Sequence, residues 1–429
     1  MDAALHPETK KAGQSTSGPL VVLLQGPVGP FFHHLAGALR KRGWRVLKIN
    51  FSIGDVLYAR GPGTLLFRDG PEQWKAWFRT FLNGNKPSAV VLFGDQRLYH
   101  RHAVDACKDY GIDVWCMEEG YIRPNYITFE LGGNNGASSS VAASEFALSS
   151  QMPATSVQTI QGNSFGPMAR AATAYFIAKN VCSFFVPDYV HHRHRSLATE
   201  AFFWNRNAWR KWSRRMTNAS SVLELLEHHD RKYFCVALQV HDDLNLIRHG
   251  NGWSMEILIE AAIRSFSQNA RDDELLVIKC HPLDRGHWTY DHLVAEISAL
   301  ANVSGRVRLI DDGPLGLLLR HARGLVVVNS TAGILALRIG CPLFVLGEAV
   351  FKHETLVQSG GVDELNQFWH NPVAVAAATR DSFLSLLIAR TQVNGDLYQR
   401  NYVAMTVAAM IEKMDARLQA SLLMQAAVE

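Results

Sequence analysis

Two adjacent carboxylates follow an apolar run in the stretch CMEEGYIRPNYITFE, residues 116–130. Glu118 and Glu119 lie between the residues WCM and GYI, where a charge is poorly hydrated, and such surroundings suit proton transfer or nucleophilic attack. Arg123 is close enough in sequence to pair with one carboxylate or to hold an anionic substrate through two hydrogen bonds. The alternative is a solvated pair that caps the next segment, and the local sequence leaves both interpretations open.

The stretch KCHPLDRG, residues 279–286, combines cationic and protonatable side chains. Lys279, His281 and Arg285 could converge on a leaving phosphate, and Pro282 would fix the backbone between them. The alternative is a core histidine beside a basic turn. So many cationic groups within one short stretch favour anion binding.

Amide and hydroxyl groups mark the predicted start of a helix in the stretch VNSTAG, residues 328–333. Free N–H groups at such a start, together with the hydroxyls of Ser330 and Thr331, form a ready anion site. Ordinary N-capping by Asn329 or Ser330 is the other interpretation, and the two are compatible. Within QVHDD, residues 239–243, Gln239 is expected to hydrogen-bond to substrate. The acidic pair of QVHDD has no partner at helpful spacing, so we expect neither a metal nor another cofactor.

The loop QGPVGP, residues 25–30, follows the first predicted strand. Gly26 and Gly29 could bring backbone N–H groups and the start of the next helix up to a phosphate or carboxylate. We expect Gly26, Pro27 and Gly29 to face the cleft from the N-terminal domain, near acceptor or sugar. A tight turn that needs a positive φ angle explains the glycines equally well. The loop is neither a GxGxxG motif nor a phosphate-binding P-loop, because no Gly-Lys-Ser/Thr follows.

Aromatic and basic residues interleave throughout residues 191–215, HHRHRSLATEAFFWNRNAWRKWSRR. Aromatic side chains prefer membrane interfaces and cations prefer anionic headgroups, so the segment indicates a membrane-surface element. Two alternatives remain open. The same composition could bind single-stranded nucleic acid by stacking, or form an interdomain helix whose aromatic residues belong to the core.

Strands and helices must alternate to position these motifs. Apolar runs predict strands at 20–25, 45–50, 89–93 and 113–117, and again at 233–238, 274–279, 307–310, 325–328 and 342–345. Helical spacing lies between them, which is the order of parallel α/β sheets. The glutamate pair, KCHPLDRG and VNSTAG all follow predicted strands. They therefore lie at the carboxyl edges of sheets, where such folds bind ligands.

The length of 429 residues predicts more than one domain. We predict a disordered tail (1–18), an N-terminal Rossmann-like domain with the basic and aromatic region (19–215), a C-terminal Rossmann-like domain (216–380), and C-terminal helices (381–429). This α/β arrangement is the GT-B fold, with an interdomain cleft. Two unrelated α/β domains are the alternative.

Composition narrows the setting of the protein. The net charge of +4 is small for this length, so nucleic acid is not an expected partner. The six cysteines form no CxxC pair, which favours a reducing compartment over a zinc site. The polar start resembles no secretory signal, and no apolar stretch is long enough to span a membrane. We expect a cytoplasmic protein.

The motifs, taken in their order along the chain, resemble the capsule polysaccharide export proteins of the KpsS/LipB type. They are LLQGPVGPFF, KINFSIGD, EEGYIRPNYITFE, LQVHDD, KCHPLDRG and VNSTAG. The resemblance spans roughly residues 21–346 and takes in both predicted domains. These proteins are similar to the β-Kdo glycosyltransferases that assemble capsules in Gram-negative bacteria.

The resemblance implies a retaining, metal-independent glycosyltransferase that uses CMP-Kdo, the activated form of an acidic sugar. It also implies that residues 19–215 form the acceptor-side domain and that residues 216–380 bind the CMP-sugar. Its acceptor would be phosphatidylglycerol or the lyso form at the inner membrane, and a single transfer would start the poly-Kdo linker of the capsule. A peripheral location on that membrane follows, with other capsule assembly proteins open as partners.

In relatives the acidic pair reads Glu-Asp-Gly, with the second carboxylate implicated in catalysis. That role falls on Glu119 in this sequence, with Glu118 or His281 as proton or charge partner. The longer side chain leaves open whether Glu119 attacks the anomeric carbon or orients another group. A transferase that extends a Kdo-primed glycan and a non-enzymatic export or scaffold protein are the alternatives.

Overall fold

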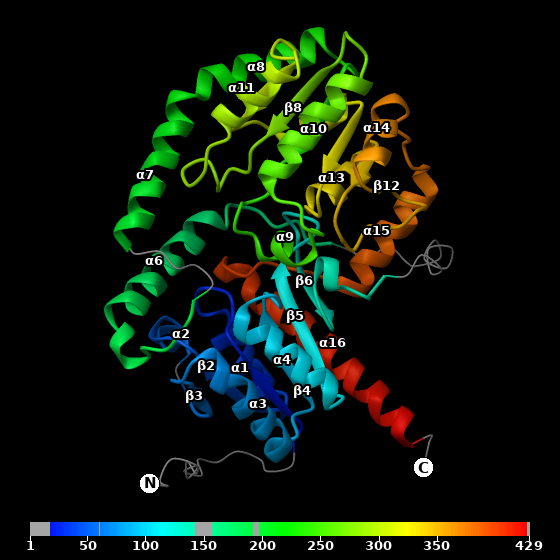
Figure 1. The fold of residues 1–429 in the computed structure, drawn as a ribbon. Coiled ribbons are helices and arrows are strands. Elements are labelled where there is room, and N and C mark those ends of the chain that lie inside the picture. The colour runs from blue at the N-terminus through cyan, green and yellow to red at the C-terminus, as the bar shows by residue number, and fades with distance from the viewer. Residues whose placement is uncertain (1–17, 60, 142–156, 192–196, 427–429) are drawn as a thin grey trace. The chain divides into compact units, whose positions relative to one another are not determined.

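The computed structural model describes residues 18–59, 61–141, 157–191 and 197–426. The predicted disordered tail lies outside the described residues, except for Gly18. The chain forms two compact units (Figure 1). The first comprises Met1–Met117, Gln158–His192 and Val393–Glu429, and the second comprises Glu118–Val157 and Arg193–Gln392. This grouping differs from the contiguous ranges that we predicted, because segments distant in sequence return to the first unit.

The first unit contains parallel strands in the order β5-β4-β1-β2-β3. Val22 of β1 is in register with Leu47 of β2 and Val90 of β4, and all of β1 is buried. Strands that are buried on both faces read as continuous apolar runs, as this sequence does. The strands are β1 (Leu20–Leu23), β2 (Arg45–Asn50), β3 (Thr64–Leu66), β4 (Ala89–Phe93) and β5 (Asp113–Glu119).

Helices surround this sheet, and the core between them is aromatic. Trp74 and Phe78 from one helix pack with Phe51 and Tyr99, all of them nearly inaccessible to solvent. The helices of this unit are α1 (Phe31–Lys41), α2 (Ile53–Tyr58), α3 (Pro71–Asn85), α4 (Leu98–Asp109), α6 (Phe165–Val181), the short η3 (Ser183–Phe185) and α16 (Arg400–Ala426).

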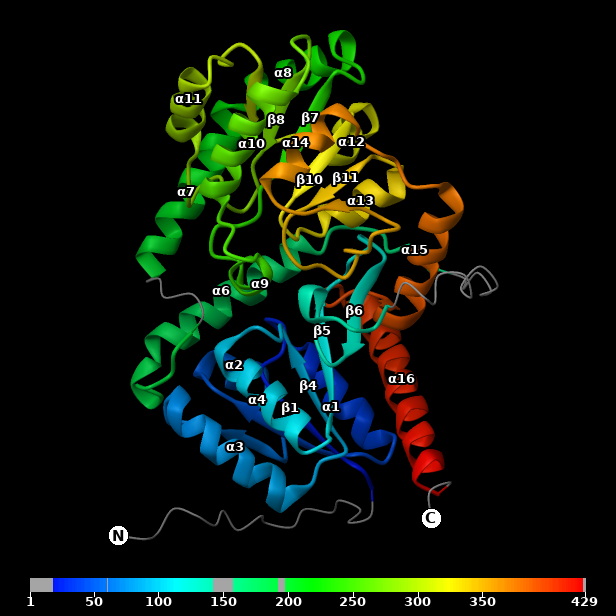
Figure 2. The ribbon, with the colours of Figure 1, turned by 45° about the vertical axis from the view of Figure 1, so that its right-hand side comes forward.

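The helix α16 belongs to the first unit although it ends the described chain. It packs along α1 (Figure 2). Arg417 forms a bidentate ion pair with Asp113 at the start of β5, at 2.8 and 3.0 Å. A return of this kind leaves no local mark in the sequence, because it depends on which apolar faces meet in the folded chain.

The second unit contains parallel strands in the order β12-β11-β10-β7-β8-β9. They are β7 (Tyr233–Ala237), β8 (Leu275–Lys279), β9 (Val307–Ile310), β10 (Gly324–Val327), β11 (Leu343–Val345) and β12 (Gln358–Ser359). Its further elements are β6 (Tyr126–Leu131), η1 (Asn135–Ala137), α7 (Leu197–Ser213), α8 (Arg215–His228), α9 (Leu244–His249), α10 (Met255–Asn269), α11 (Asp291–Leu300), α12 (Leu315–His321), α13 (Ala332–Ile339), α14 (Val362–His370) and α15 (Ala377–Thr391).

Hydrophobic clusters cover both faces of this second sheet. Tyr233 and Cys235 of β7 belong to one cluster, and the intervening Phe234 and Val236 belong to the other. Successive side chains of a strand point to opposite faces, so this split shows a sheet that is buried on both sides.

The α/β class, the two Rossmann-like sheets and the C-terminal helix of the predicted fold are confirmed. Two local expectations need correction. The strand β5 continues through Glu119 rather than ending at Met117, so both glutamates are strand residues. The prediction of uninterrupted helix from Asp381 is wrong, because β13 (Gln392–Asn394) separates α15 from α16.

Candidate active site and anion pocket

The end of β5 places the two glutamates next to a tight backbone contact. Gly120 follows them directly, and a Cβ atom there would lie 1.9 Å from the carbonyl oxygen of Tyr126. The hydroxyl of Thr128 donates to the carbonyl oxygen of Glu119 at 3.2 Å, which ties β6 to the same turn. Only glycine allows the chain to return this closely beside the acidic pair.

The two carboxylates have different partners. Glu119 forms an ion pair with Arg123 at 3.7 Å, and its side chain is 41% exposed. Glu118 accepts a hydrogen bond from the Nδ2 of Asn245 at 3.5 Å. The Nε of Arg123 also donates to the carbonyl oxygen of Gly120 at 3.0 Å, so the arginine closes its own turn. Glu119 is therefore the accessible carboxylate that is paired with a cation.

A pocket of about 320 Å³ in the second unit gathers residues from three of the predicted motifs. Arg123 comes from the turn after β5, Lys279 and His281 from the end of β8, and a hydroxyl pair from the start of α13. The predicted site residues that line it are Arg123, Lys279, His281, Pro282, Ser330 and Thr331. The pocket joins the arginine that contacts Glu119 to the predicted phosphate site.

Two polar residues of this pocket were missed in the sequence. Tyr121 lines it next to the acidic pair, and its hydroxyl donates to the buried carboxylate of Glu130 at 2.6 Å. Arg338 reaches it from α13 and shares a helix face with Thr331 and Leu335, which also line the pocket. A signal for Arg338 existed, since it is the charge that interrupts an otherwise apolar helix.

The electrostatics of the pocket favour an anion. Burial lowers the pKa of Lys279, whose Nζ donates to the carbonyl oxygens of Cys280 and Asp311 at 3.1 and 3.4 Å. Burial lowers the pKa of His281 to about 4, and the charges of Arg123 and Lys279 contribute to the same shift. The same cations that disfavour a charged imidazole attract a phosphate or carboxylate.

His281 is therefore a neutral hydrogen-bond donor at neutral pH rather than a cation. Its Nδ1 accepts from the backbone N–H of Leu283 at 3.2 Å, so the proton of the neutral ring resides on Nε2. That N–H group can donate a hydrogen bond to an anion in the pocket.

We expect the pKa of His281 to rise from about 4 when CMP is added. The bound phosphate offsets the charges that disfavour protonation of the ring. Without ligand, the pKa lies below the ordinary value of 6.5, so unfolding takes up a proton and stability falls as the pH drops from about 6.5 toward 4. Carbon-13 NMR titrations of the histidine with and without CMP measure its two pKa values. If the pKa of His281 does not change when CMP is added, the phosphate does not bind beside this ring.

Three other residues predicted for donor binding do not line the pocket. Arg285 is 4% exposed, donates to the carbonyl oxygen of Asp311 and pairs with Asp312 at 3.4 Å. Gln239 and Asn329 hydrogen-bond to each other, with Nε2 donating to Oδ1 at 2.9 Å. The contacts of Arg285 join the loops that follow β8 and β9, and the contact between Gln239 and Asn329 joins those that follow β7 and β10. The three side chains therefore hold the loops that carry the pocket.

The start of α13 combines hydroxyls with close packing. Ser330 accepts a hydrogen bond from the backbone N–H of Ala332 at 3.2 Å, which is the ordinary local bonding of a helix start. A Cβ atom on Gly333 would lie 2.5 Å from the ring of Phe351, so glycine lets the helix approach its neighbour. Ser330 therefore takes part in the ordinary hydrogen bonding of a helix start and also lines the pocket.

In the first unit, the loop after β1 is organised by the side chain of Gln25. Its Nε2 donates to Asp55 and to the hydroxyls of Tyr175 and Tyr189, and its Oε1 accepts from Arg97 at 2.9 Å. Gly29 has a φ of 106°, and a Cβ atom on Gly26 would lie 2.7 Å from the ring of Phe32. The turn thus requires both glycines on conformational and packing grounds. Gly26, Pro27 and Gly29 do not line the anion pocket of the second unit, and they do not line the groove between α1 and α16.

The aromatic and basic segment is largely the helix α7, with part of it outside the described residues. Two of its arginines face the protein, since Arg210 and Arg214 pair with Asp291 at 2.9 and 3.0 Å. Two of its tryptophans are exposed, Trp209 at 62% and Trp212 at 69%. The alternative in which these aromatics form a core is therefore wrong for the two tryptophans.

Neither a metal cluster nor a membrane span is found in the described part of the chain. No group of three or more His, Cys, Asp or Glu side chains is arranged to hold a metal ion among those residues. No helix in the described ranges has the length and apolar character needed to cross a membrane.

A family model described as capsule polysaccharide biosynthesis protein matches residues 88–398 of the chain. The chain belongs to this family. The matched range contains the glutamate pair and every residue of the pocket. The resemblance expected from the sequence motifs is confirmed.

Two members of the capsule family are similar over most of their length. The capsule polysaccharide export protein KpsS of Escherichia coli is 33% identical, covering 89% of this chain and 97% of that protein. The capsule polysaccharide modification protein LipB of Neisseria meningitidis is 30% identical, covering 89% and 92%. Among solved structures, Thermosulfurimonas dismutans KpsC, a β-Kdo 2,7-transferase, covers 93% of this chain and 100% of that chain at 11% identity, with a TM-score of 0.40.

Proposed function

We propose that this protein transfers a single Kdo from CMP-Kdo to a phosphatidylglycerol-type lipid with retention, starting the poly-Kdo linker of a capsular polysaccharide. The carrying observation is the pocket that gathers Arg123, Lys279, His281 and Arg338 beside the hydroxyls of α13. A pocket this cationic suits a ligand with two anionic groups, and CMP-Kdo has a phosphate and a sugar carboxylate. Family membership supports the role in capsule synthesis.

The proposed chemistry is a double displacement. A carboxylate oxygen of Glu119 attacks the anomeric carbon, and the bond from that carbon to the phosphate oxygen of CMP breaks with its electron pair. Lys279 and the Nε2–H of His281 stabilise the charge that develops on the departing phosphate. An acceptor hydroxyl then attacks the same carbon from the opposite side, its proton passes to Glu118, and the ester to Glu119 breaks. Two inversions give net retention.

Arg123 has a double role in this proposal. It pairs with Glu119 at 3.7 Å and lines the pocket, so it connects the reacting carboxylate to the donor. With Arg338 it provides a pair of guanidinium groups in the pocket, suited to the sugar carboxylate. A donor sugar without that carboxylate would leave these arginines uncompensated.

The exposed face of α7 supports a lipid acceptor. Phe202, Trp209 and Trp212 are exposed on it, and Lys211 and Arg215 are exposed beside them. Exposed tryptophans flanked by cations are typical of helices that lie on anionic membranes. A peripheral location on the inner membrane follows for the proposed enzyme.

The test is incubation with CMP-Kdo and a fluorescent phosphatidylglycerol, followed by mass spectrometry of the lipid. We expect a mass gain of one Kdo, and no gain with UDP-N-acetylglucosamine as donor. Extension of a Kdo-primed glycan without any gain on the lipid would make the protein a polymerising transferase instead. Absence of transfer to either acceptor under conditions in which CMP-Kdo binds would sink the enzymatic proposal.

A further inference from the structure

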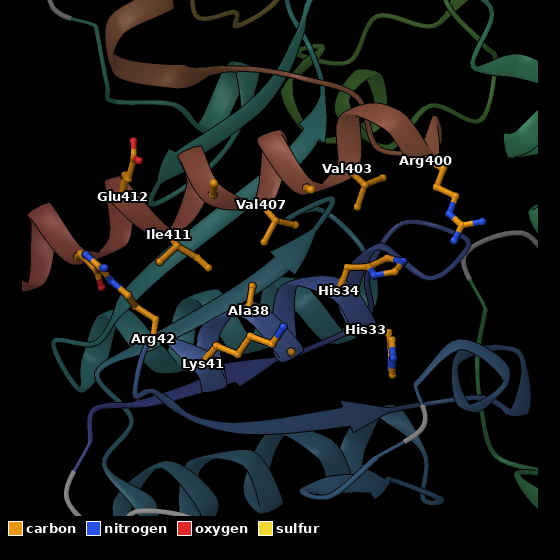
Figure 3. A pocket seen from close by; sticks show the side chains of 14 residues that line it. His33, His34, Ala38, Lys41, Arg42, Arg400, Val403, Val407, Ile411 and Glu412 are labelled. Carbon is orange, nitrogen blue, oxygen red and sulfur yellow. The ribbon is translucent and has the colours of Figure 1, made fainter.

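A groove of about 680 Å³ lies between α1 and α16 within the first unit, apart from the anion pocket (Figure 3). Val403, Val407 and Ile411 point from α16 toward α1, and Ala38 points back from α1. These three branched side chains recur every four residues and so share one face of the helix. They are nearly buried, whereas the neighbouring Ala408 is exposed. The small side chain of Ala408 leaves space beside the branched side chains, so the middle of the groove is apolar.

The length of this groove suits one extended hydrocarbon chain. Its lining runs along α16 from Arg400 to Asp415, which corresponds to about 22 Å of helix. One leaflet of a bilayer is about 15 Å of hydrocarbon deep, which is half of the full core. An acyl chain therefore fits along the groove with room for its headgroup at one end.

The charges along the groove are unequal at its two ends. At one end, Lys41 and Arg42 lie with Glu412 and Asp415, and Arg42 pairs with Asp415 at 2.8 Å. That end is close to neutral.

The opposite end carries the positive charge of Arg400 and two histidine rings. His33, His34 and Arg400 line it, and Arg400 reaches from the first turn of α16 toward His34 (Figure 3). None of the groove residues at this end is a carboxylate, and no ion pair to Arg400 occurs within the described residues. Both helices begin at this end, so the partial positive charges of their N-termini add to the side chains. The arrangement is complementary to a phosphate.

We propose that this groove holds the acyl chain of a single-chain anionic phospholipid, with its phosphate between His34 and Arg400. The inference rests on the proposed lipid acceptor and adds the place where that lipid is held. Without such a groove, the acyl chain of the acceptor would stay in the bilayer while its headgroup met a water-soluble donor. A chain-binding groove lets the enzyme draw one lipid partly out and present its headgroup.

The test measures equilibrium binding of lysophosphatidylglycerol with a fluorescent acyl chain, below its micelle-forming concentration and without sugar donor. The substitution Ala408→Trp places a large side chain in the groove from an exposed position. It is expected to weaken the binding of lysophosphatidylglycerol at least 10-fold. Ala416→Trp is the matched control, because Ala416 is exposed on the same helix and does not line the groove. We expect its affinity to stay within two-fold of wild type.

The headgroup end is tested with Arg400→Gln. This variant is expected to weaken the binding of lysophosphatidylglycerol about five-fold or more and to leave that of an uncharged monoacylglycerol unchanged. Wild-type affinity in Ala408→Trp overturns the proposal, as does equally tight wild-type binding of both lipids. A wild-type dimer that becomes monomeric in Ala408→Trp also overturns it, since a second copy would then occupy the groove.

The two proposals fail separately. Transfer of Kdo to glycerophosphoglycerol, which has the headgroup without an acyl chain, does not require the groove. Such transfer without lipid binding at the groove overturns only the groove, and lipid binding without transfer to any acceptor overturns only the proposed reaction.

Discussion

Replacing Glu119 by glutamine is expected to lower the rate of Kdo transfer by about 10³-fold or more while leaving the fold intact. The amide keeps the size of the side chain but is not a nucleophile. Because the side chain is 41% exposed, the change leaves no buried group without a partner. The rate is measured as CMP release in the presence of acceptor, and folding is monitored by circular dichroism.

Because Glu119 forms an ion pair with Arg123, its loss could also act by displacing the arginine, and this explanation must be excluded. If Glu119 only positioned Arg123, then Arg123→Gln would reproduce the defect of Glu119→Gln. We expect instead that Glu119→Gln lowers kcat with little change in donor KM, whereas Arg123→Gln mainly raises donor KM. Glu119→Asp should recover part of the activity, because aspartate keeps the carboxylate on a side chain that is shorter by one methylene group.

A protein-bound intermediate separates attack from positioning directly. With CMP-Kdo alone, wild-type protein should gain the mass of one Kdo residue, and Glu119→Gln should gain none. Near-normal turnover in Glu119→Gln would show that the reacting carboxylate is another one.

Replacing Gly120 by alanine is expected to lower the free energy of unfolding by about 3 kcal/mol. The new methyl group would lie 1.9 Å from the carbonyl oxygen of Tyr126, and neither backbone segment can move without disturbing the end of β5. Urea denaturation followed by tryptophan fluorescence measures the loss. Since Arg123 donates to the carbonyl oxygen of Gly120, donor affinity should fall as well.

The control for this substitution is Gly305→Ala in the same unit. Gly305 is exposed, and no atom lies within 4 Å of a Cβ atom added there. Its effect should stay within about 0.5 kcal/mol. If Gly120→Ala were as stable as this control, the close return of the chain after the acidic pair would not be a constraint.

Much of the fold could be predicted because its strands are buried on both faces. The strand β4, for example, appears as the short apolar run AVVLF, and it was predicted with the bounds that it has in the structure. The position of KCHPLDRG and VNSTAG after strands of one parallel sheet then required their side chains to lie at the same edge. That is why the sequence alone was enough to group Lys279, His281, Ser330 and Thr331, which all line the pocket.

Side-chain direction could not be read in the same way. Arg285 belongs to the same motif as Lys279, yet it turns toward Asp311 and Asp312 and away from the pocket. Gln239 and Asn329 satisfy each other instead of facing a ligand. Buried polar groups take whichever partners the packed loops offer, and those partners come from distant parts of the chain.

The local patterns in the sequence were sufficient to predict a capsule-family α/β protein with an acidic pair at one strand end and anion-binding motifs at others. The folded chain was needed to see that Arg123 both pairs with Glu119 and lines the pocket, that Arg338 lines it too, and that α16 returns to α1 to form a groove. The difference lies in the range of the interactions. Strand and helix patterns are set by neighbouring residues, whereas pockets and grooves are set by which surfaces meet after the chain has folded.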